Sequence, residues 1–247
     1  MQKLAQHHLK EIGEYYPGLR LESCDDDFAT YTGMIAFSAN YCNHGLVAEQ
    51  FNVKIVFPLT DTFAVPTAEE TGGRIPREPD FHINPDGTMC LGAPLAVCRK
   101  LKQDSSLKAF IDNQVIHFLY GYCIKKKYGY WPFDELAHGG KGIVEYYKDF
   151  FKTDSELAIL ELLKIIVEDN YRGHVPCPCG SGSRLRNCHG PEIREIKEQQ
   201  SREQFFSDFV DCLKIYTDAG NKMPRRLLTK RLRSYWSRMA DKTADTT

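Results

Sequence analysis

The chain has 247 residues, of which 42% are hydrophobic and 26% are charged, so it can bury a core and is not globally disordered. Its formal net charge of -1 argues against a dedicated nucleic-acid binder, and no apolar run approaches the roughly 18 residues that cross a membrane. The polar N-terminus lacks the apolar run of a secretory signal, so we expect a cytoplasmic protein of one or two domains with no membrane partner.

The first part of the chain predicts one helix followed by a short series of strands. Residues 2–15 carry apolar positions at helical spacing, and a Pro-Gly pair ends this helix. Strand-forming residues follow at 19–39, interrupted by an acidic turn at 25–27, and at 47–58, where every second position is apolar. Residues 63–71 predict an edge strand, because a proline within them cannot donate a ladder hydrogen bond.

The rest of the chain predicts mainly helices. The longest covers residues 106–129, with an N-cap at Asp104 or Ser105 and a run of lysines near its C-terminal end. Further helices are expected at 143–151, 155–170, 192–216 and 225–236. The order of helix, strands, loop and helices predicts an α+β fold rather than an alternation of strands and helices. We expect one domain over residues 1–152 and a helical extension over residues 153–247.

Four potential metal ligands lie close together in the second half of the chain. Cys177, Cys179, Cys188 and His189 follow the spacing C-x-C-x8-C-H. Three thiolates and one imidazole form a common tetrahedral set for structural zinc, and four protein ligands leave no open position for a catalytic water. Glycines between the ligands allow the sharp turn that brings the two ligand pairs together. The nine cysteines are odd in number and unevenly spaced, which indicates reduced thiols and a zinc site rather than disulfides.

This cluster also carries a family resemblance. The stretch "CPCGSGSRLRNCHG" resembles the SEC-C motif, a small zinc-binding segment found on the bacterial secretion ATPase and on many unrelated bacterial proteins. The resemblance implies a structural zinc within residues 174–190 and a docking surface, and it does not imply the secretion function. A module this small cannot bury enough apolar surface to fold unaided, so metal binding would supply about 10–16 kcal/mol of folding energy.

A thiol stands directly after a tight turn in the stretch "DFHINPDGTMCLGAP", residues 80–94. The turn at 84–87 predicts that Cys90 lies on an exposed, backbone-constrained segment, and a thiol must be accessible and positioned to act as a nucleophile. His82 could act as a base or orient a neighbour, and the Asn84 amide could stabilise a developing oxyanion. The alternative is that Cys90 is a small buried hydrophobe at the start of a core segment.

The elements around this thiol resemble the ubiquitin-conjugating enzymes. In that family a strand that ends in Phe-Pro leads to a His-Pro-Asn triplet and then to a Gly-x-x-Cys-Leu stretch with the thioester-forming cysteine. Here Phe57-Pro58 matches the strand end, His82-Ile83-Asn84 matches the triplet with Ile in place of Pro, and residues 87–91 match the last stretch. The resemblance spans roughly residues 1–150 and is closest to divergent bacterial members in anti-phage and ubiquitin-like conjugation operons. No tryptophan follows the thiol at the family's short distance, since Trp131 lies far downstream.

The resemblance implies the fold of those enzymes and an acyl-transfer reaction. Cys90 would take the C-terminus of a ubiquitin-like protein, or of another protein tail, from the thioester of an activating-enzyme-type partner. It would then pass this acyl group to an amine of a target protein. Asn84 would bind the oxyanion, and His82 would hold the loop or assist proton transfer. The sequence has no glycine-rich nucleotide loop, so the activating step must come from a partner.

The sequence is also compatible with two functions of other classes. A non-catalytic adaptor would join two partners through a degenerate conjugating fold and the zinc knuckle. A fully buried Cys90 would favour this adaptor. A cysteine hydrolase would pair Cys90 with His82 or His138 and needs a histidine nitrogen within hydrogen-bond reach of the sulfur. Cys98 is expected to pack rather than to accept an acyl group. The basic residues between 222 and 238 are expected to form a solvated face rather than a nucleic-acid site.

Overall fold

The structure is a computed structural model that describes residues 2–41, 44–60, 64–133, 140–235 and 237. The chain divides into two compact units, unit 1 over residues 1–138 and unit 2 over residues 139–247. Unit 1 contains a four-stranded antiparallel sheet with helices, which confirms the predicted α+β class. Among the described helices, none is both long and apolar enough to span a bilayer.

The elements follow one another in the order that the sequence predicts, with some additions. Unit 1 contains α1 (Gln2–Ile12), β1 (Leu19–Cys24), β2 (Phe28–Ala39), β3 (Val47–Pro58), β4 (Thr67–Glu70), the 3-10 turn η1 (Pro79–Phe81), α2 (Pro94–Gln103), α3 (Leu107–Phe110), the π-turn η2 (Ile111–Val115) and α4 (Ile116–Tyr128). Unit 2 contains α5 (Gly140–Phe151), α6 (Glu156–Val167), the 3-10 turn η3 (Leu185–Asn187), α7 (Gly190–Ile196), α8 (Arg202–Asp218) and the 3-10 turn η4 (Arg225–Leu227).

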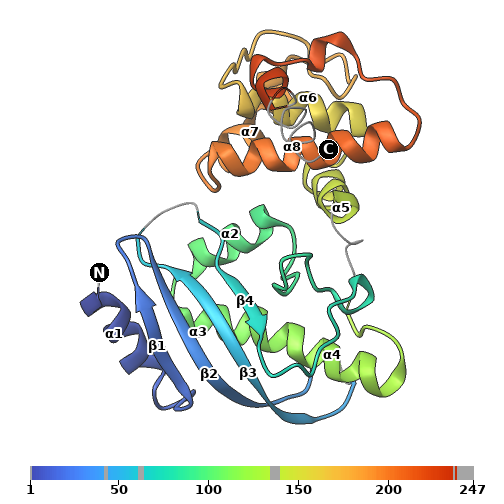
Figure 1. The fold of residues 1–247 in the computed structure, drawn as a ribbon. Coiled ribbons are helices and arrows are strands. Elements are labelled where there is room, and N and C mark those ends of the chain that lie inside the picture. The colour runs from blue at the N-terminus through green and yellow to red at the C-terminus, as the bar shows by residue number, and fades with distance from the viewer. Residues whose placement is uncertain (1, 42–43, 61–63, 134–139, 236, 238–247) are drawn as a thin grey trace. The chain divides into compact units, whose positions relative to one another are not determined.

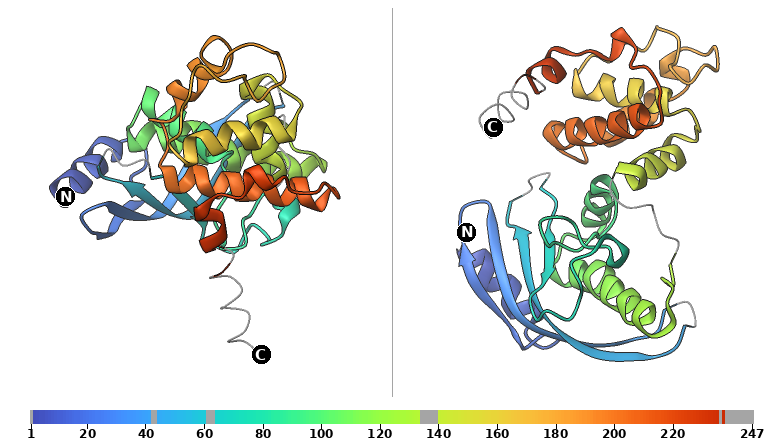
Figure 2. Two further views of the ribbon diagram at one scale, coloured as in Figure 1. Left: turned by 90° about the horizontal axis from the view of Figure 1, so that it is seen from above. Right: turned by 45° about the vertical axis from the view of Figure 1, so that its right-hand side comes forward.

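The sheet is a meander in the order β1-β2-β3-β4 (Figure 1). β2 and β3 pair along their whole length, from Phe28 opposite Pro58 to Ala39 opposite Val47 (Figure 2). The apolar residues at alternate positions of β3 are buried, so one face of the sheet is apolar. Asp25 fixes the predicted turn between β1 and β2, because its carboxylate accepts hydrogen bonds from two backbone N–H groups at 2.8 and 2.7 Å.

The segment from α3 through η2 to α4 packs against this apolar face (Figure 1). The ring centroids of Phe57 and Phe110 lie 5.8 Å apart, and those of Phe51 and Tyr122 lie 6.0 Å apart. Burial of a large apolar side chain stabilises a fold by about 1.5–3 kcal/mol, so these contacts fix the helical segment on the sheet. They also place the middle of that segment opposite the loop that follows β4.

The N-cap of this helical segment differs from the prediction. Ser106, and neither Asp104 nor Ser105, is the N-cap, and its hydroxyl accepts a hydrogen bond from the Ala109 N–H at 3.1 Å. The Asp104 carboxylate instead accepts a hydrogen bond from the Ser106 N–H at 2.9 Å, which fixes the turn that enters the helix. The side chains of Asp and Ser can both accept a hydrogen bond from a free N–H at a helix start. Residue type alone therefore does not show which of residues 104–106 is the N-cap.

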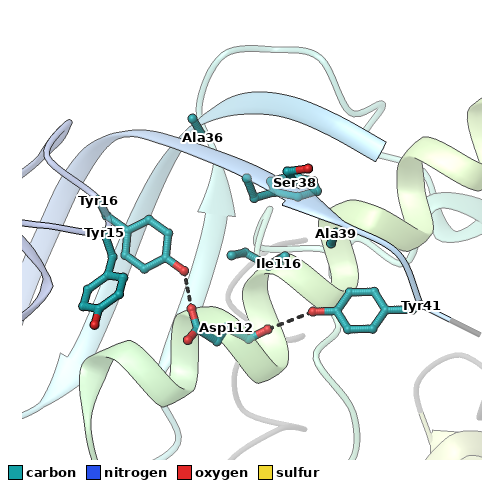
Figure 3. Close-up of a pocket in the computed structure, with 9 residues that line it drawn as sticks. Tyr15, Tyr16, Ala36, Ser38, Ala39, Tyr41, Asp112 and Ile116 are labelled. Carbon is teal, nitrogen blue, oxygen red and sulfur yellow. Dashed lines mark hydrogen bonds between the residues drawn. The ribbon is translucent and has the colours of Figure 1, made fainter. Parts of the chain in front are cut away.

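The π-turn inside the segment is held by contacts on one side of the helix. The Asp112 carboxylate accepts a hydrogen bond from the Tyr16 hydroxyl (Figure 3), and it also accepts one from the Lys108 ammonium. The Tyr41 hydroxyl donates to the Asp112 backbone carbonyl at 3.4 Å. Tyr16, Tyr41 and Asp112 line a hollow of about 310 Å³ together with residues that include Ile116. Asp112 therefore fixes the rotation of the helix at the turn.

Helix α2 is not among the predicted elements. It begins with Pro94 at a position where the missing N–H costs nothing, and it buries Leu95, Val97 and Cys98. Its 10 residues present too few repeats for a periodic pattern to stand out from the surrounding loop. Cys98 is 5% exposed and packs in this buried row.

Unit 2 begins with α5, which packs against α6 and α8. The division between the units therefore falls before α5, whereas the expected boundary at residue 152 falls after it. A buried carboxylate joins these helices, since Asp208 accepts hydrogen bonds from the Tyr147 hydroxyl and from the Gln200 amide, each at 2.8 Å. Burial raises the pKa of the Asp208 carboxyl, although these donors favour its charged form.

Two of the expected C-terminal helices are shorter than predicted. The helix expected at 192–216 is divided into α7 and α8, because Ser201 caps α8 by accepting a hydrogen bond from the Gln204 N–H at 3.0 Å. The helix expected at 225–236 consists of a 3-10 turn and a helical stretch at 230–235.

Acidic residues pair with two arginines of the basic stretch between 222 and 238. Arg226 forms an ion pair with Glu161, and Arg231 forms one with Glu203 at 3.3 Å. These pairs fit the expected solvated face better than a surface reserved for phosphates.

We predict that unit 1 loses stability above pH 10. Burial, with the Asp112 hydrogen bond for Tyr16, raises the pKa of Tyr16 and Tyr31 above the ordinary value of 10. A raised pKa favours the protonated form in the folded state, so stability is full below pH 10 and falls as pH rises further. Each tyrosine would remove up to about 1.4 kcal/mol per pH unit.

Urea denaturation of the full chain between pH 8 and 11, with fluorescence and tyrosinate absorbance as readouts, measures this loss. Tyr31→Phe should reduce the slope of stability against pH. A stability that stays constant from pH 9.5 to 11 would contradict the prediction.

Candidate functional site

A short hairpin carries the thiol that the sequence analysis singles out. The Cys90 N–H donates to the His82 carbonyl at 2.8 Å, and the Asn84 N–H donates to the Thr88 carbonyl at 2.8 Å. Gly87 lies in the left-handed region at φ 90°, which suits glycine, and its N–H donates to the Asn84 carbonyl at 2.9 Å. The backbone therefore fixes the direction in which residue 90 leaves the turn.

The hairpin is joined to the sheet on its other side. The Met89 N–H donates to the Ala68 carbonyl of β4 at 2.7 Å, and Met89 is 3% exposed. The Asp86 carboxylate accepts hydrogen bonds from the Thr88 N–H at 3.0 Å and from its hydroxyl at 2.7 Å. These hydrogen bonds, the side-chain one first, lower the pKa of Asp86. The turn therefore stays closed by a charged acceptor at neutral pH.

Cys90 lies at the wall of a cavity of about 200 Å³. The other walls come from the hairpin and loop, from α2, from η2 and α4, and from the segment after α4, through residues that include His82, Lys100, Gln114, His117, Trp131 and Phe133. Cys90 is half-buried, and its burial raises the pKa of the thiol, although a hydrogen bond from the Gly92 backbone N–H lowers it in part. The thiol is thus mainly protonated at neutral pH.

The structure brings His82 to the same cavity. Its side chain is 8% exposed, and its backbone adopts φ 54°, which is uncommon for a residue other than glycine. Its ring meets the Trp131 ring edge-on, with centroids 4.6 Å apart. Trp131, which the sequence separates widely from Cys90, therefore lies against His82 and itself lines the cavity.

Asn84 has a different environment. Its side-chain Nδ2 donates to the Thr88 hydroxyl at 3.0 Å, across the turn that it begins. Asn84 is not among the residues that line the cavity. Its amide therefore supports the turn, and the structure does not bring it to the cavity with Cys90 and His82.

Sequence reasoning missed the polar residues that the helical segment contributes. Asn113, Gln114 and His117 line the cavity together with the apolar residue Phe118. Burial, with the nearby charge of Lys100, lowers the pKa of His117, so its ring is neutral at pH 7. The sequence does contain a signal for these residues. Asn113 and Gln114 lie four and three positions before His117 in the long helix that the sequence predicts, so they lie on one face of it.

In unit 2 the four predicted ligands come together. The Cys177 sulfur lies 3.2 Å from His189 Nδ1, the Cys188 sulfur lies 3.3 Å from the same nitrogen, and the Cys179 and Cys188 sulfurs lie 3.5 Å apart. All four ligand atoms lie within 4.8 Å of one another. Metal–sulfur bonds of about 2.3 Å in a tetrahedron give edges of roughly 3.8 Å, so the cluster fits one metal ion.

The backbone of the knuckle positions these ligands. The Cys177 N–H donates to the Ser183 carbonyl at 2.8 Å, and the Leu185 N–H donates to the Val175 carbonyl at 2.8 Å. Gly180 lies in the left-handed region at φ 80°, within the turn that separates the ligand pairs. On the far side of the imidazole, His189 Nε2 lies 2.7 Å from the Phe151 carbonyl of α5 and donates to it, which leaves Nδ1 free for the metal.

Comparison with known proteins identifies the knuckle alone. A family model described as the SEC-C motif matches residues 175–191, which confirms the resemblance predicted for this segment. No curated protein and no solved structure matches the chain. The likeness to ubiquitin-conjugating enzymes therefore stays a prediction.

We predict that Cys90 reacts slowly with iodoacetamide at pH 7 and that its rate still rises above pH 9. The raised pKa means that the reactive thiolate is rarer than in a free thiol, and it increases only as pH approaches the higher pKa. The measurement is the alkylation rate of the Cys90 peptide by mass spectrometry, with glutathione as the reference thiol. A rate that levels off at or below pH 8 would contradict the prediction.

Proposed function

We propose that unit 1 is an acyl carrier and transferase of the ubiquitin-conjugating kind. Cys90 forms a thioester with the C-terminus of a ubiquitin-like protein or of another protein tail, and it passes this acyl group to an amine of a target protein. The observation that carries the proposal is the half-buried thiol, set at the end of a hydrogen-bonded hairpin and facing a cavity of about 200 Å³.

The chemistry of the thiol supports a carrier. The Cys90 thiolate attacks the carbonyl carbon of the incoming thioester, a new C–S bond forms, and the partner's thiolate leaves and takes a proton from water. Because burial raises the pKa of Cys90, its sulfur is a poorer leaving group than an ordinary thiolate. A thioester on such a sulfur resists water and waits for a better nucleophile, which is what a carrier requires.

The arrangement of unit 1 supports the same proposal. The N-terminal helix, the antiparallel meander, the thiol hairpin and the long helical segment occur in the order that the resemblance implies. The chain shows no nucleotide loop in its sequence, so an activating-enzyme-type partner supplies the tail as a thioester. In this proposal the protein works in the cytoplasm of a bacterium, within an anti-phage or conjugation operon.

The sulfur environment favours a carrier over a hydrolase. A hydrolase needs a histidine nitrogen at the sulfur, oriented by a third group. Among the described residues, no hydrogen bond joins a histidine nitrogen to the Cys90 sulfur, which accepts from the Gly92 N–H. His138, the other histidine considered for this role, lies outside the described residues. A non-catalytic adaptor is the remaining alternative, and it requires that the thiol be dispensable.

We further propose that the metal of the knuckle is zinc, bound by Cys177, Cys179, Cys188 and His189. Three thiolates and one imidazole are the ligands of a structural zinc site, and a closed set of four fits structure rather than catalysis. Zinc would hold the two ends of the knuckle together and stabilise the fold of unit 2.

We predict one zinc per chain, and we expect Cys179→Ser to lose most of the bound zinc. Removal of one ligand leaves three, and metal affinity and the folding energy that depends on it both fall. Elemental analysis of protein purified without chelators measures the zinc, and hydrogen exchange measures the stability of each unit. Protection should fall in unit 2 and not in unit 1, whereas the control Cys24→Ser should change neither. Less than half an equivalent in the wild type would contradict the assignment.

We predict that Cys90→Ala abolishes conjugate formation and leaves the fold intact, because a half-buried thiol contributes little packing. Cys90→Ser should trap a slower adduct that resists reducing agents, since an oxyester exchanges less readily than a thioester. The assay combines the protein with ATP, a candidate activating enzyme and candidate tail proteins, and it detects an adduct that reducing agent removes. Cys98→Ala is the control and should retain the adduct.

A different result would redirect the proposal. Loss of the adduct in Cys98→Ala but not in Cys90→Ala would move the nucleophile to Cys98. Partner binding that survives both substitutions, with no adduct in the wild type, would favour the adaptor.

A further inference from the structure

A buried amide lies at the wall of the thiol cavity, and its oxygen has no hydrogen-bond partner among the described residues. The Gln114 side chain is 4% exposed, and its Oε1 is buried without a hydrogen bond. No hydrogen bond with the described residues involves either end of this amide. An unsatisfied buried polar group costs about 1–3 kcal/mol, so a fold seldom retains one without a use for it. Gln200, which is equally buried, also has an unpartnered oxygen, but its Nε2 donates to Asp208 at 2.8 Å, whereas no such bond from Gln114 Nε2 to a described residue is present.

The π-turn presents this amide to the cavity. The Ile116 N–H donates to the Ile111 carbonyl, one residue further back than in an α-helix. Asp112 faces the other way, where Tyr16 and Tyr41 hold it (Figure 3). Gln114 lines the Cys90 cavity instead. A π-turn is a rare and costly irregularity that recurs at functional sites, and here it separates a clamped residue from one directed to the thiol.

The chemistry of the cavity indicates what the amide binds. The ring of Trp131 and the side chains of Phe118 and Phe133 make much of the wall apolar. At about 200 Å³ the cavity is smaller than the pockets that enclose whole drug-sized molecules, so it suits the end of a chain. A side-chain amide offers two donors and one acceptor without charge, which matches the carbonyl and N–H of a peptide tail.

We propose that Gln114, rather than Asn84, binds the acyl carbonyl of the tail that reacts with Cys90. This inference rests on the proposed function. When the Cys90 thiolate attacks the thioester, the carbonyl oxygen becomes an oxyanion, and Gln114 Nε2 donates a hydrogen bond to it. The tetrahedral intermediate then expels the partner's thiolate, which takes a proton from water. The Asn84 amide is already committed to Thr88 within the turn.

The test compares two probes of Cys90 in the full chain. The first is the mercaptoethanesulfonate thioester of N-acetyl-alanyl-glycine, which carries a peptide tail and a carbonyl. The second is methyl methanethiosulfonate, which modifies thiolates and has no carbonyl. Mass spectrometry of the Cys90 peptide gives both rates, and their ratio cancels changes in thiolate fraction and in access to the sulfur.

Gln114→Met keeps the volume and removes the donor. We expect the rate ratio to fall about 100-fold, the size of effect that follows loss of one oxyanion donor. The rate with methyl methanethiosulfonate should stay the same. Gln103→Met, the same substitution at an exposed position of α2, is the matched control and should leave the ratio unchanged.

Gln114→Glu tests whether residue 114 donates a hydrogen bond or only supports the structure. A purely structural role would not make the rate ratio depend on pH. A charged carboxylate accepts hydrogen bonds but cannot donate one, so the ratio should be low when it is ionised. A protonated carboxyl can donate, so the ratio should recover as pH falls through the pKa of the new glutamate. The wild-type ratio should show no such rise.

The outcomes separate the two proposals. An unchanged ratio in Gln114→Met, or a ratio in Gln114→Glu that does not recover on acidification, overturns the role of Gln114 and leaves the carrier function standing. A loss in Asn84→Ala that exceeds the loss in Gln114→Met overturns it in favour of Asn84. If wild-type Cys90 reacts with methyl methanethiosulfonate but never with the thioester, the carrier function itself fails.

Discussion

The hydrogen bond between the Met89 N–H and the Ala68 carbonyl, at 2.7 Å, is the link on which the thiol site depends. It joins the hairpin to β4, and the buried Met89 side chain fixes the hairpin on the core. Because successive side chains of an extended segment point to opposite sides, an inward Met89 turns Cys90 outward to the cavity. Residues of α4 contribute to the opposite wall, and aromatic contacts between this helix and the sheet hold it in place. The position of the thiol at the cavity therefore depends on the core of unit 1.

Features that depend on local chemistry could be predicted from the sequence. The acidic turn at Asp25 follows from a carboxylate that can accept nearby N–H groups, and β3 follows from its alternation of apolar residues. The four predicted ligands of the knuckle lie within 13 residues, so their spacing alone predicted the cluster that could hold a metal ion. In each case the interacting groups are close in the chain, and few conformations compete.

Features that depend on distant contacts could not be predicted in the same way. The cavity combines His82, Gln114 and Trp131, and only the packing of the helical segment on the sheet brings them together. The π-turn has no pattern of its own, since it depends on Tyr16 and Tyr41 holding Asp112. Asn84 shows the opposite problem, because its amide fits an oxyanion by residue type while its actual partner, Thr88, is four residues away. Residue type indicates what a side chain can bind, and the fold decides what it meets.

The contact between His189 Nε2 and the Phe151 carbonyl gives the knuckle a second effect. The last carbonyls of a helix have no partner within it, and this ring supplies one at the end of α5. The ring is held in that orientation when Nδ1 binds a metal. Because residue 189 lies 38 positions after Phe151, this carbonyl gains its partner only after the knuckle has been synthesised. The same imidazole that would bind a metal through Nδ1 therefore also completes the end of a helix far earlier in the chain.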